Sequence, residues 1–165
     1  MPIRLADESD VPFLWRMLTF AAQMDGSEEA IASAKADPTL KSYLVDFPRE
    51  SDLGMVAENA DGLRIAGAWL RTGEPGPGKV WTRESPELAI ATIPEARGTG
   101  TGGLLLGALI ERARGRFDAI TLSVREGNPA ARLYPRFGFV VVSQMTNRVG
   151  TASLSMRLDL NGGRP

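Results

Sequence analysis

The sequence predicts a single α/β domain, residues 1–165, with a mixed sheet of about seven strands and about four flanking helices. Three observations carry this prediction. The length of 165 residues suits one hydrophobic core. Short apolar runs bounded by Gly, Pro, Asn and Asp alternate with stretches of helical periodicity. A helical segment that ends near Gly115 joins the apolar run 88–93 to the run 119–124, so we expect these two strands to be parallel.

The first half of the chain predicts three strands and at least two helices. Asp7 to Asp10 can cap the first helix, and Ser27 can cap the second. Asp61-Gly62 has the turn chemistry of a hairpin. The expected strands are residues 3–6, 53–58 and 63–71. The first expected helix begins near Val11 and Pro12, has its apolar residues between Phe13 and Ala21 and is broken at residues 24–26. The second is expected at residues 28–36, with one or two further turns within 39–47.

The second half begins with residues 72–85, the stretch densest in Gly and Pro, which predicts a long surface loop. The run 88–93 is apolar on both faces, which is typical of a central strand. A short helix is expected to begin at Asn128. The remaining expected strands are residues 119–124, 139–145 and 152–158, of which the last two form a closing antiparallel pair.

The composition excludes several kinds of chemistry. The chain has no cysteine and no histidine, which removes disulfides, the usual zinc sites and Ser-His-Asp catalysis. Its net charge of −1 supplies no basic field for nucleic acid. No apolar stretch reaches the roughly 18 residues of a membrane span, and the first residues do not read as a signal peptide. We therefore expect a cytoplasmic protein with no metal, nucleic-acid partner or membrane partner.

A glycine-rich turn is the main functional feature. Between the strand at 88–93 and the following helix, four of the six residues from Gly98 to Gly103 are glycine. Bare backbone at a helix N-terminus offers free N–H groups and partial positive charge, which together form an anion site, and Arg97 adds a full charge.

The same glycines spell G-x-G-x-x-G, the dinucleotide fingerprint, and Asp118 follows at the distance of its ribose-binding acid. The context argues against this alternative. Residues 94–97 separate the strand from the first glycine, and Asp118 precedes a strand instead of ending one. About 60 residues remain after the turn, too few for the second half of that fold.

Two motifs together resemble the GCN5-related N-acetyltransferases, the GNAT family. Arg97-x-x-Gly100-x-Gly102 is similar to that family's coenzyme A pyrophosphate loop, and the segment from Asn128 through Leu133-Tyr134 to Gly138-Phe139 is similar to its downstream signature. The resemblance implies the family's fold, with splayed central parallel strands, and an acetyl-CoA-dependent N-acetyltransferase acting on a small-molecule or peptide amine. A non-catalytic acyl-CoA-binding module on the same fold is the alternative.

The resemblance also assigns coenzyme contacts. Strand residues 90–92 would pair with the two amides of pantetheine, in the manner of an added strand. Asn128 would contact the pantetheine or phosphate end, although it can also serve as a helix cap. The full set of expected coenzyme residues is Ile90, Ala91, Thr92, Arg97, Gly98, Thr99, Gly100, Thr101, Gly102, Gly103 and Asn128.

Two residues are candidates for the proton transfers. Tyr134 matches the family's general acid, with a core tyrosine as the alternative, and Pro135 is expected to end the helix early at this point. Glu87 is the candidate base, because it opens the strand expected to carry the thioester. An exposed strand-end carboxylate is the alternative for Glu87, and a reaction without a dedicated base is also open.

The acceptor is left undefined by the sequence. Asp25, Glu28 and Glu29 could attract a cationic amine, although Glu28 and Glu29 also suit the N-terminus of a helix. Trp81 either lines the acceptor pocket or covers the loop. The acyl-chain preference and the oligomeric state stay open, a homodimer included.

Overall fold

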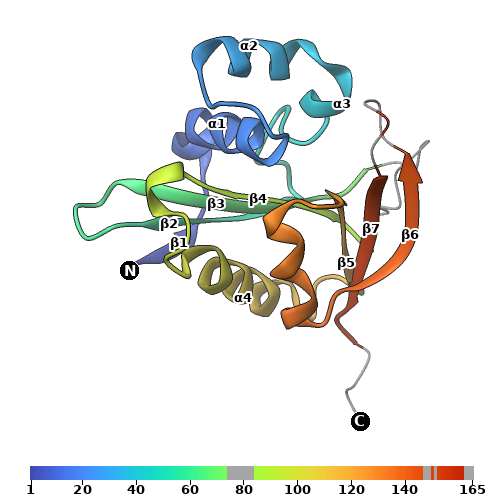
Figure 1. Cartoon of the computed structure of the whole chain (residues 1–165). Coiled ribbons are helices and arrows are strands. Elements are labelled where there is room, and N and C mark those ends of the chain that lie inside the picture. Colours follow the sequence, from blue (N-terminus) through green and yellow to red (C-terminus); the bar gives the residue numbers. More distant parts are fainter. Residues whose placement is uncertain (74–83, 147–149, 151, 162–165) are drawn as a thin grey trace. The chain divides into compact units, whose positions relative to one another are not determined.

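A computed structural model of the chain describes residues 1–73, 84–146, 150 and 152–161. Within these residues, seven strands form one mixed sheet in the order β1-β2-β3-β4-β5-β7-β6 (Figure 1). The α/β class and the mixed seven-stranded sheet expected from the sequence are therefore confirmed. The strands are β1 (Ile3–Leu5), β2 (Leu53–Glu58), β3 (Arg64–Arg71), β4 (Glu87–Thr92), β5 (Ala119–Arg125), β6 (Val140–Thr146) and β7 (Ala152–Asp159).

The helices fall into two kinds. The α-helices are α1 (Val11–Ala21), α2 (Glu28–Ala36), α3 (Pro38–Lys41) and α4 (Thr101–Ala113), and the short 3-10 helices are η1 (Glu8–Asp10), η2 (Pro94–Ala96), η3 (Pro129–Arg132) and η4 (Tyr134–Phe137). The expected cap of α2 is confirmed, since the Ser27 side chain accepts a hydrogen bond from the N–H of Ala30. The Asp7 side chain caps η1, whereas Asp10, which directly precedes α1, makes no side-chain cap hydrogen bond there.

The β4 and β5 strands form a parallel pair. β4 and β5 run in the same direction and pair at Glu87 and Thr121, near the start of each strand. The backbone N–H of Thr121 also donates to the carbonyl of Pro86 at 2.9 Å.

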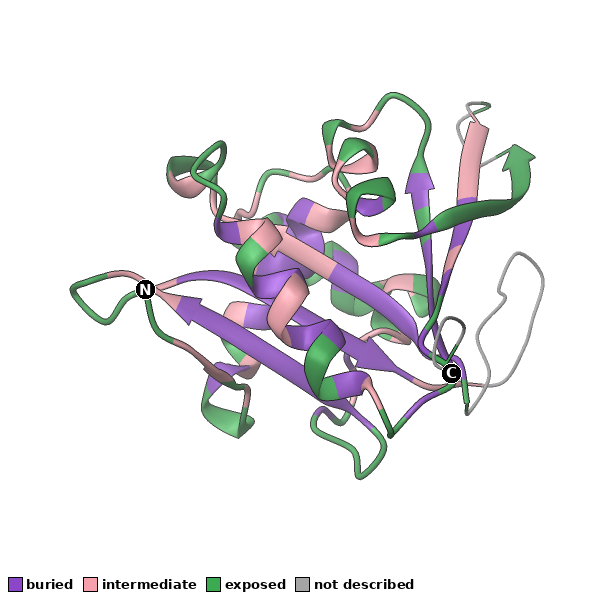
Figure 2. Cartoon of the chain, turned by 90° about the horizontal axis from the view of Figure 1, so that it is seen from below, coloured by how far each residue is buried: buried purple, intermediate pink, exposed green. Residues whose placement is uncertain are grey.

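The described residues separate into two compact units. Unit 1 comprises Met1–Arg71 and Ala89–Glu111, and unit 2 comprises Thr72–Leu88 and Arg112–Pro165. In unit 1, α1 and α4 cover opposite faces of the strands β1 to β3 (Figure 1). The strands beneath α4 are largely buried (Figure 2). The core on the α1 face includes Leu14, Met17 and Trp69, each with no exposed surface.

Two buried carboxylates, Asp10 and Asp52, form ion pairs that anchor unit 1. Asp10 is fully buried and accepts hydrogen bonds from Arg4 at 2.8 and 2.9 Å and from Arg64 at 2.6 Å. Burial opposes the charged form, but the hydrogen bonds from Arg4 and Arg64 outweigh it and hold the pKa of Asp10 well below its usual range. A second buried pair joins Arg71 to Asp52 at 2.7 Å. These contacts connect β1, β3 and the segments that lead into α1 and β2.

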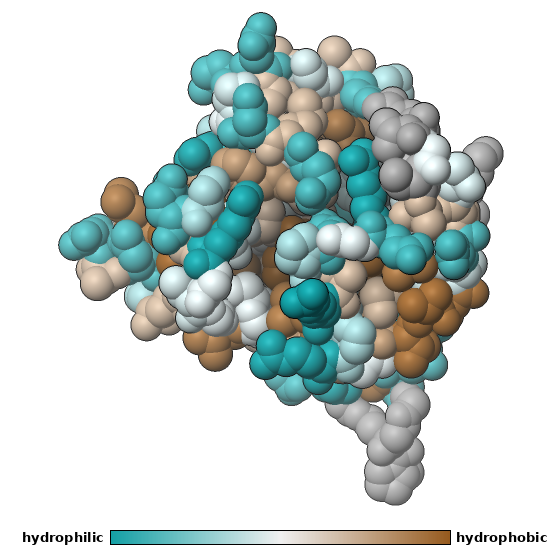
Figure 3. All heavy atoms as spheres, viewed as in Figure 1, coloured by the Kyte–Doolittle hydropathy of each residue, from teal (hydrophilic) through white to brown (hydrophobic). Residues whose placement is uncertain are grey.

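Unit 2 contains β5, β7 and β6 in that order. The β5 and β7 strands are antiparallel, with Ala119 opposite Asp159, and β6 lies at the edge of the sheet. Three adjacent valines of β6, Val140, Val141 and Val142, are at least half exposed. Hydrophobic side chains gather over β6 on the face seen in Figure 3. The expected closing hairpin is confirmed by the β6–β7 pairing.

Candidate functional site

The glycine-rich turn has the backbone geometry of an anion cradle. After β4, the short helix η2 leads into a turn at residues 98–100, and α4 begins at Thr101. Gly98 and Gly100 have φ angles of +75° and +85°, which favour glycine. A Cβ atom added at either position would meet no other atom within 4 Å, so the space beside both residues is open.

The N–H groups of this turn are not used within the chain. In the part of the chain that the structure describes, no backbone N–H from Gly98 to Gly103 donates a hydrogen bond. The first backbone donor after them is the N–H of Leu104, which reaches the carbonyl of Gly100 at 3.1 Å. Unpaired donors at the N-terminus of a 13-residue helix are an anion site, and the turn therefore fits a diphosphate.

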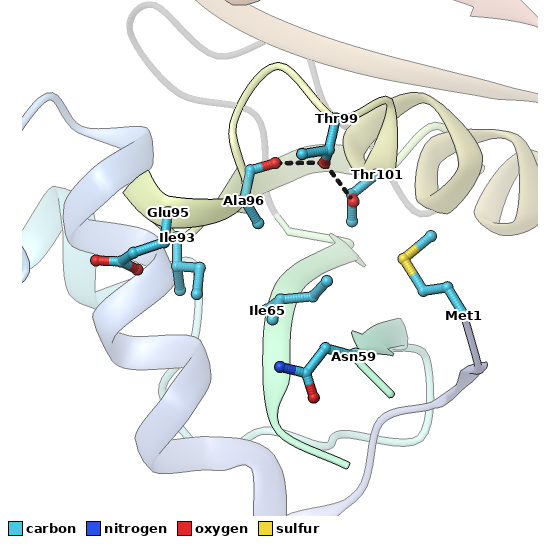
Figure 4. A pocket seen from close by; sticks show the side chains of 8 residues that line it. All are labelled: Met1, Asn59, Ile65, Ile93, Glu95, Ala96, Thr99 and Thr101. Carbon is cyan, nitrogen blue, oxygen red and sulfur yellow. Dashed lines mark hydrogen bonds between the residues drawn. The ribbon is translucent and has the colours of Figure 1, made fainter. Parts of the chain in front are cut away.

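Two threonines brace the turn from within. The Thr99 hydroxyl donates to the carbonyl of Ala96 at 2.5 Å and lies 2.8 Å from the Thr101 hydroxyl (Figure 4). Their side chains face a hollow of about 390 Å³ that Met1, Ile65 and Ile93 also line. The hollow is mainly apolar and carries Glu95, so it does not suit an anion and is distinct in chemistry from the row of free N–H groups.

Arg97 is exposed but held in place. Its Nε donates to the carbonyl of Thr92 at 3.4 Å, and its guanidinium carbon lies 5.2 Å from the centre of the Phe20 ring. Arg16 lies on the same ring at 5.4 Å. Sequence reasoning missed Arg16 and Phe20, although their spacing of four residues on a helix was a signal that they share a face.

The strand residues expected to pair with pantetheine lie at the end of β4. Ile90, Ala91 and Thr92 are partly buried, and a Cβ added to Gly102 would lie 3.6 Å from the Thr92 hydroxyl. Beyond them, the N–H of Ile93 donates to the carbonyl of Ile65 at 2.9 Å. β4 therefore leads through η2 into the glycine-rich turn, which is the order of elements that the sequence predicted.

Glu87 is deeply buried at the start of β4. Its exposed fraction is 2%, so the alternative of an exposed strand-end carboxylate is wrong. Burial raises the pKa of Glu87 to about 8, because the charged form loses its hydration. A carboxyl group with this pKa is mostly protonated at neutral pH, and it can exchange a proton in the range where amines lose theirs.

Tyr134 is buried at the junction between two 3-10 helices. It begins η4, separated by Leu133 from the end of η3 at Arg132, and Pro135 follows it. Its ring packs edge-on against Phe139 with centroids 5.7 Å apart, and burial raises the pKa of Tyr134 to about 12. The phenol therefore stays protonated across the physiological range and can act as a proton donor.

The expected early end of the helix at Pro135 is confirmed, because the segment divides into η3 and η4 and does not form one α-helix. Asn128 caps η3, since its side-chain oxygen accepts from the N–H of Ala130 at 2.9 Å. The side-chain NH₂ of Asn128 has no partner among the described residues, so it remains free to bind a ligand.

The residues considered for the acceptor side lie around the α1–α2 turn. Asp25 and Glu29, with Ser27 and Ser33, line a hollow of about 370 Å³. Glu28 and Glu29 also occupy the first turn of α2, where carboxylates complement the helix N-terminus. Trp81 lies outside the described residues. Among the described residues, no cluster of carboxylates could hold a metal ion, and no helix is long and apolar enough to cross a membrane.

The fold and the site point to an acetyltransferase, and the comparisons establish the family. Residues 52–141 match the model of the acetyltransferase (GNAT) domain. The chain therefore belongs to the GNAT family and is an N-acetyltransferase with acetyl-CoA as its cosubstrate. No curated protein matches the sequence.

Solved structures share this fold over nearly the whole chain. Ribosomal-protein-alanine N-acetyltransferase from Brucella melitensis is 25% identical, with a TM-score of 0.73, over 97% of this chain and 100% of that one. The yncA protein from Salmonella typhimurium, with its cofactor acetyl-CoA, is 23% identical, with a TM-score of 0.69, over 100% and 96%. Spermidine N-acetyltransferase from Vibrio cholerae is 18% identical, with a TM-score of 0.67, over 98% and 96%.

Proposed function

We propose that this chain transfers an acetyl group directly from acetyl-CoA to a primary amine of a small molecule or a peptide. The observation that carries the proposal is the row of backbone N–H groups from Gly98 to Gly103, which have no partner in the described chain. These groups and the α4 N-terminus would bind the coenzyme diphosphate, and Arg97 would add a full positive charge.

The other coenzyme contacts follow from the family motif. Main-chain groups of Ile90, Ala91 and Thr92 would pair with the amides of pantetheine. Asn128 would use its free NH₂ group, because its side-chain oxygen is already engaged in capping η3. Bound acetyl-CoA supplies an activated acetyl thioester, whose transfer to an amine releases a thiolate.

Glu87 and Tyr134 would manage the two protons. An amine must lose a proton to become nucleophilic, and Glu87, with a pKa of about 8, would accept it above that pH. The Tyr134 phenol, with a pKa of about 12, would donate a proton to the departing sulfur. Both side chains are buried, which favours proton transfer to the substrate over exchange with water.

The hollow lined by Asp25 and Glu29 favours a cationic acceptor. Asp25 is exposed, and hydrogen bonds from Ser27 hold its pKa below the usual range, so it is charged at neutral pH. Together with Glu29 it gives this hollow a negative field. A cationic acceptor, such as a polyamine or a peptide with a free N-terminus, would be attracted to it.

A panel of amines with detection of released thiol tests the proposal. The panel should include spermidine and a peptide with an N-terminal alanine, since solved relatives carry those activities in their names. We expect turnover with at least one amine, and Tyr134→Phe should abolish most of it while coenzyme affinity is kept. Coenzyme A binding without turnover on any amine would instead favour the non-catalytic acyl-CoA-binding module.

The proposal includes the number of domains in the chain. We infer that residues 1–165 act as one acetyltransferase domain, because the family match at 52–141 takes residues from both units. A cytoplasmic location and a homodimer stay predictions. Size-exclusion chromatography with light scattering would test the homodimer.

A further inference from the structure

Phe20 brings together two arginines that have no anionic partner among the described residues. It lies in the last turns of α1, with the guanidinium carbons of Arg16 and Arg97 at 5.4 and 5.2 Å from its ring centre. Neither arginine forms an ion pair with a carboxylate in the described part of the chain. A ring face attracts a cation but does not neutralise it, so two positive charges remain available beside the glycine-rich turn.

The ring itself is held firmly. Phe20 is 7% exposed, and the backbone of Gly26 passes so close that a Cβ added there would lie 2.4 Å from its Cζ atom. Gly26 also has a φ of +76°, so a side chain at this position is disfavoured on two grounds. The α1–α2 turn therefore fixes the ring on which both guanidinium groups rest.

We propose that Arg16 is a second cationic contact for the phosphates of the coenzyme, beside Arg97, and that Phe20 is the positioning residue for both. This inference rests on the proposed function. Coenzyme A carries a diphosphate and a ribose 3′-phosphate, so one arginine does not balance its charge. Guanidinium groups are suited to phosphate oxygens, because their N–H donors match the geometry of the anion.

Calorimetric titration with three ligands tests the inference without relying on turnover. Coenzyme A carries all phosphates, dephospho-coenzyme A lacks the 3′-phosphate, and pantetheine lacks every phosphate. Arg16→Gln should weaken coenzyme A binding about tenfold, which corresponds to about 1.4 kcal/mol, and should leave pantetheine binding unchanged. The salt dependence of the coenzyme affinity should also become less steep. If Arg16→Gln does not weaken the binding of dephospho-coenzyme A, Arg16 contacts the 3′-phosphate. If it weakens that binding as well, Arg16 contacts the diphosphate.

Lys35 provides a matched control. Its ammonium lies 5.5 Å from the ring centre of Trp15, another aromatic residue of α1, so Lys35→Gln also removes a cation from a ring but not from Phe20. We expect Lys35→Gln to bind coenzyme A as the unchanged protein does, and Phe20→Leu to weaken coenzyme A binding without affecting pantetheine. Arg16 is only partly buried, so Arg16→Gln should fold even if Phe20→Leu does not.

Two results would overturn the inference. Arg16→Gln could bind coenzyme A as tightly as the unchanged protein, or it could lose affinity for pantetheine to the same extent. A different result, no binding of coenzyme A by the unchanged protein, would instead contradict the proposed function.

Discussion

Replacing Glu87 with glutamine should stabilise the folded protein at neutral and alkaline pH. Burial raises the folded-state pKa of Glu87 from 4.5 to about 8. As pH rises above 4.5, the unfolded chain releases this proton while the folded chain retains it, so the folded state loses stability until the pH reaches about 8. Glutamine resembles the protonated side chain in shape and cannot ionise, so it removes this loss.

The magnitude follows from the interval between the two pKa values. Each pH unit in which only the unfolded state ionises costs about 1.4 kcal/mol, so the advantage of Glu87→Gln at pH 7 is about 3 kcal/mol. It reaches about 5 kcal/mol above pH 8, where both states are ionised, and approaches zero below pH 4.5.

Urea unfolding of both proteins at pH 4, 7 and 9 measures this difference directly. The same variant should lose most of its activity, and in the unchanged protein kcat/KM should rise as pH passes through about 8. A stability difference that is constant with pH, or that grows toward acid pH, would refute the reasoning about the buried carboxyl. An activity profile unchanged by the substitution would favour a reaction without a dedicated base.

Three further substitutions, one of them with a matched control, test other parts of the structure. Tyr134→Phe should lower kcat about 100-fold without changing the coenzyme Kd or the urea midpoint, because the ring still packs on Phe139. Gly98→Ala should lower the free energy of unfolding by about 1–2 kcal/mol and raise the coenzyme Kd at least about tenfold. Gly62 has a similar φ of +79°, so Gly62→Ala should lower the free energy of unfolding by the same amount and leave the coenzyme Kd unchanged. Asp10→Asn should reduce the free energy of unfolding by about 3 kcal/mol at pH 7, and this loss should shrink as pH falls below 3.8, where the native carboxylate also loses its advantage. Equal coenzyme affinities for the two glycine variants, or an Asp10→Asn cost that grows toward acid pH, would contradict these expectations.

Local sequence signals predicted most of the fold. The strand β2 has the expected bounds at residues 53–58, and the helix α2 has the expected bounds at residues 28–36. These elements have apolar patterns or caps that act over a few residues, such as the Ser27 hydroxyl on the N–H of Ala30. β3 begins at Arg64, one residue later than expected, because the N–H of Leu63 donates to the Asn59 side chain within the turn.

The site was predictable where the motif is contiguous, and less so where distant residues meet. The strand, the glycine-rich turn and the helix lie in one stretch, so their order predicted the free N–H groups of residues 98–103. The burial of Glu87 was not predictable, because strand alternation indicates a face but not what covers it. The stacking of Arg97 on Phe20 depends on a contact across 77 residues, and the sequence alone contains no signal for it.

The free edge of β6 has a consequence for handling the protein. The strand from Val140 to Thr146 bears no charged side chain, and its three valines face water at the rim of a sheet. Such rims are open to pairing with another extended chain unless lysine, proline or a bulge interrupts them. The register shift between Val141 and Ser143 is one such interruption, so a substitution that straightened it would be expected to promote precipitation at high concentration.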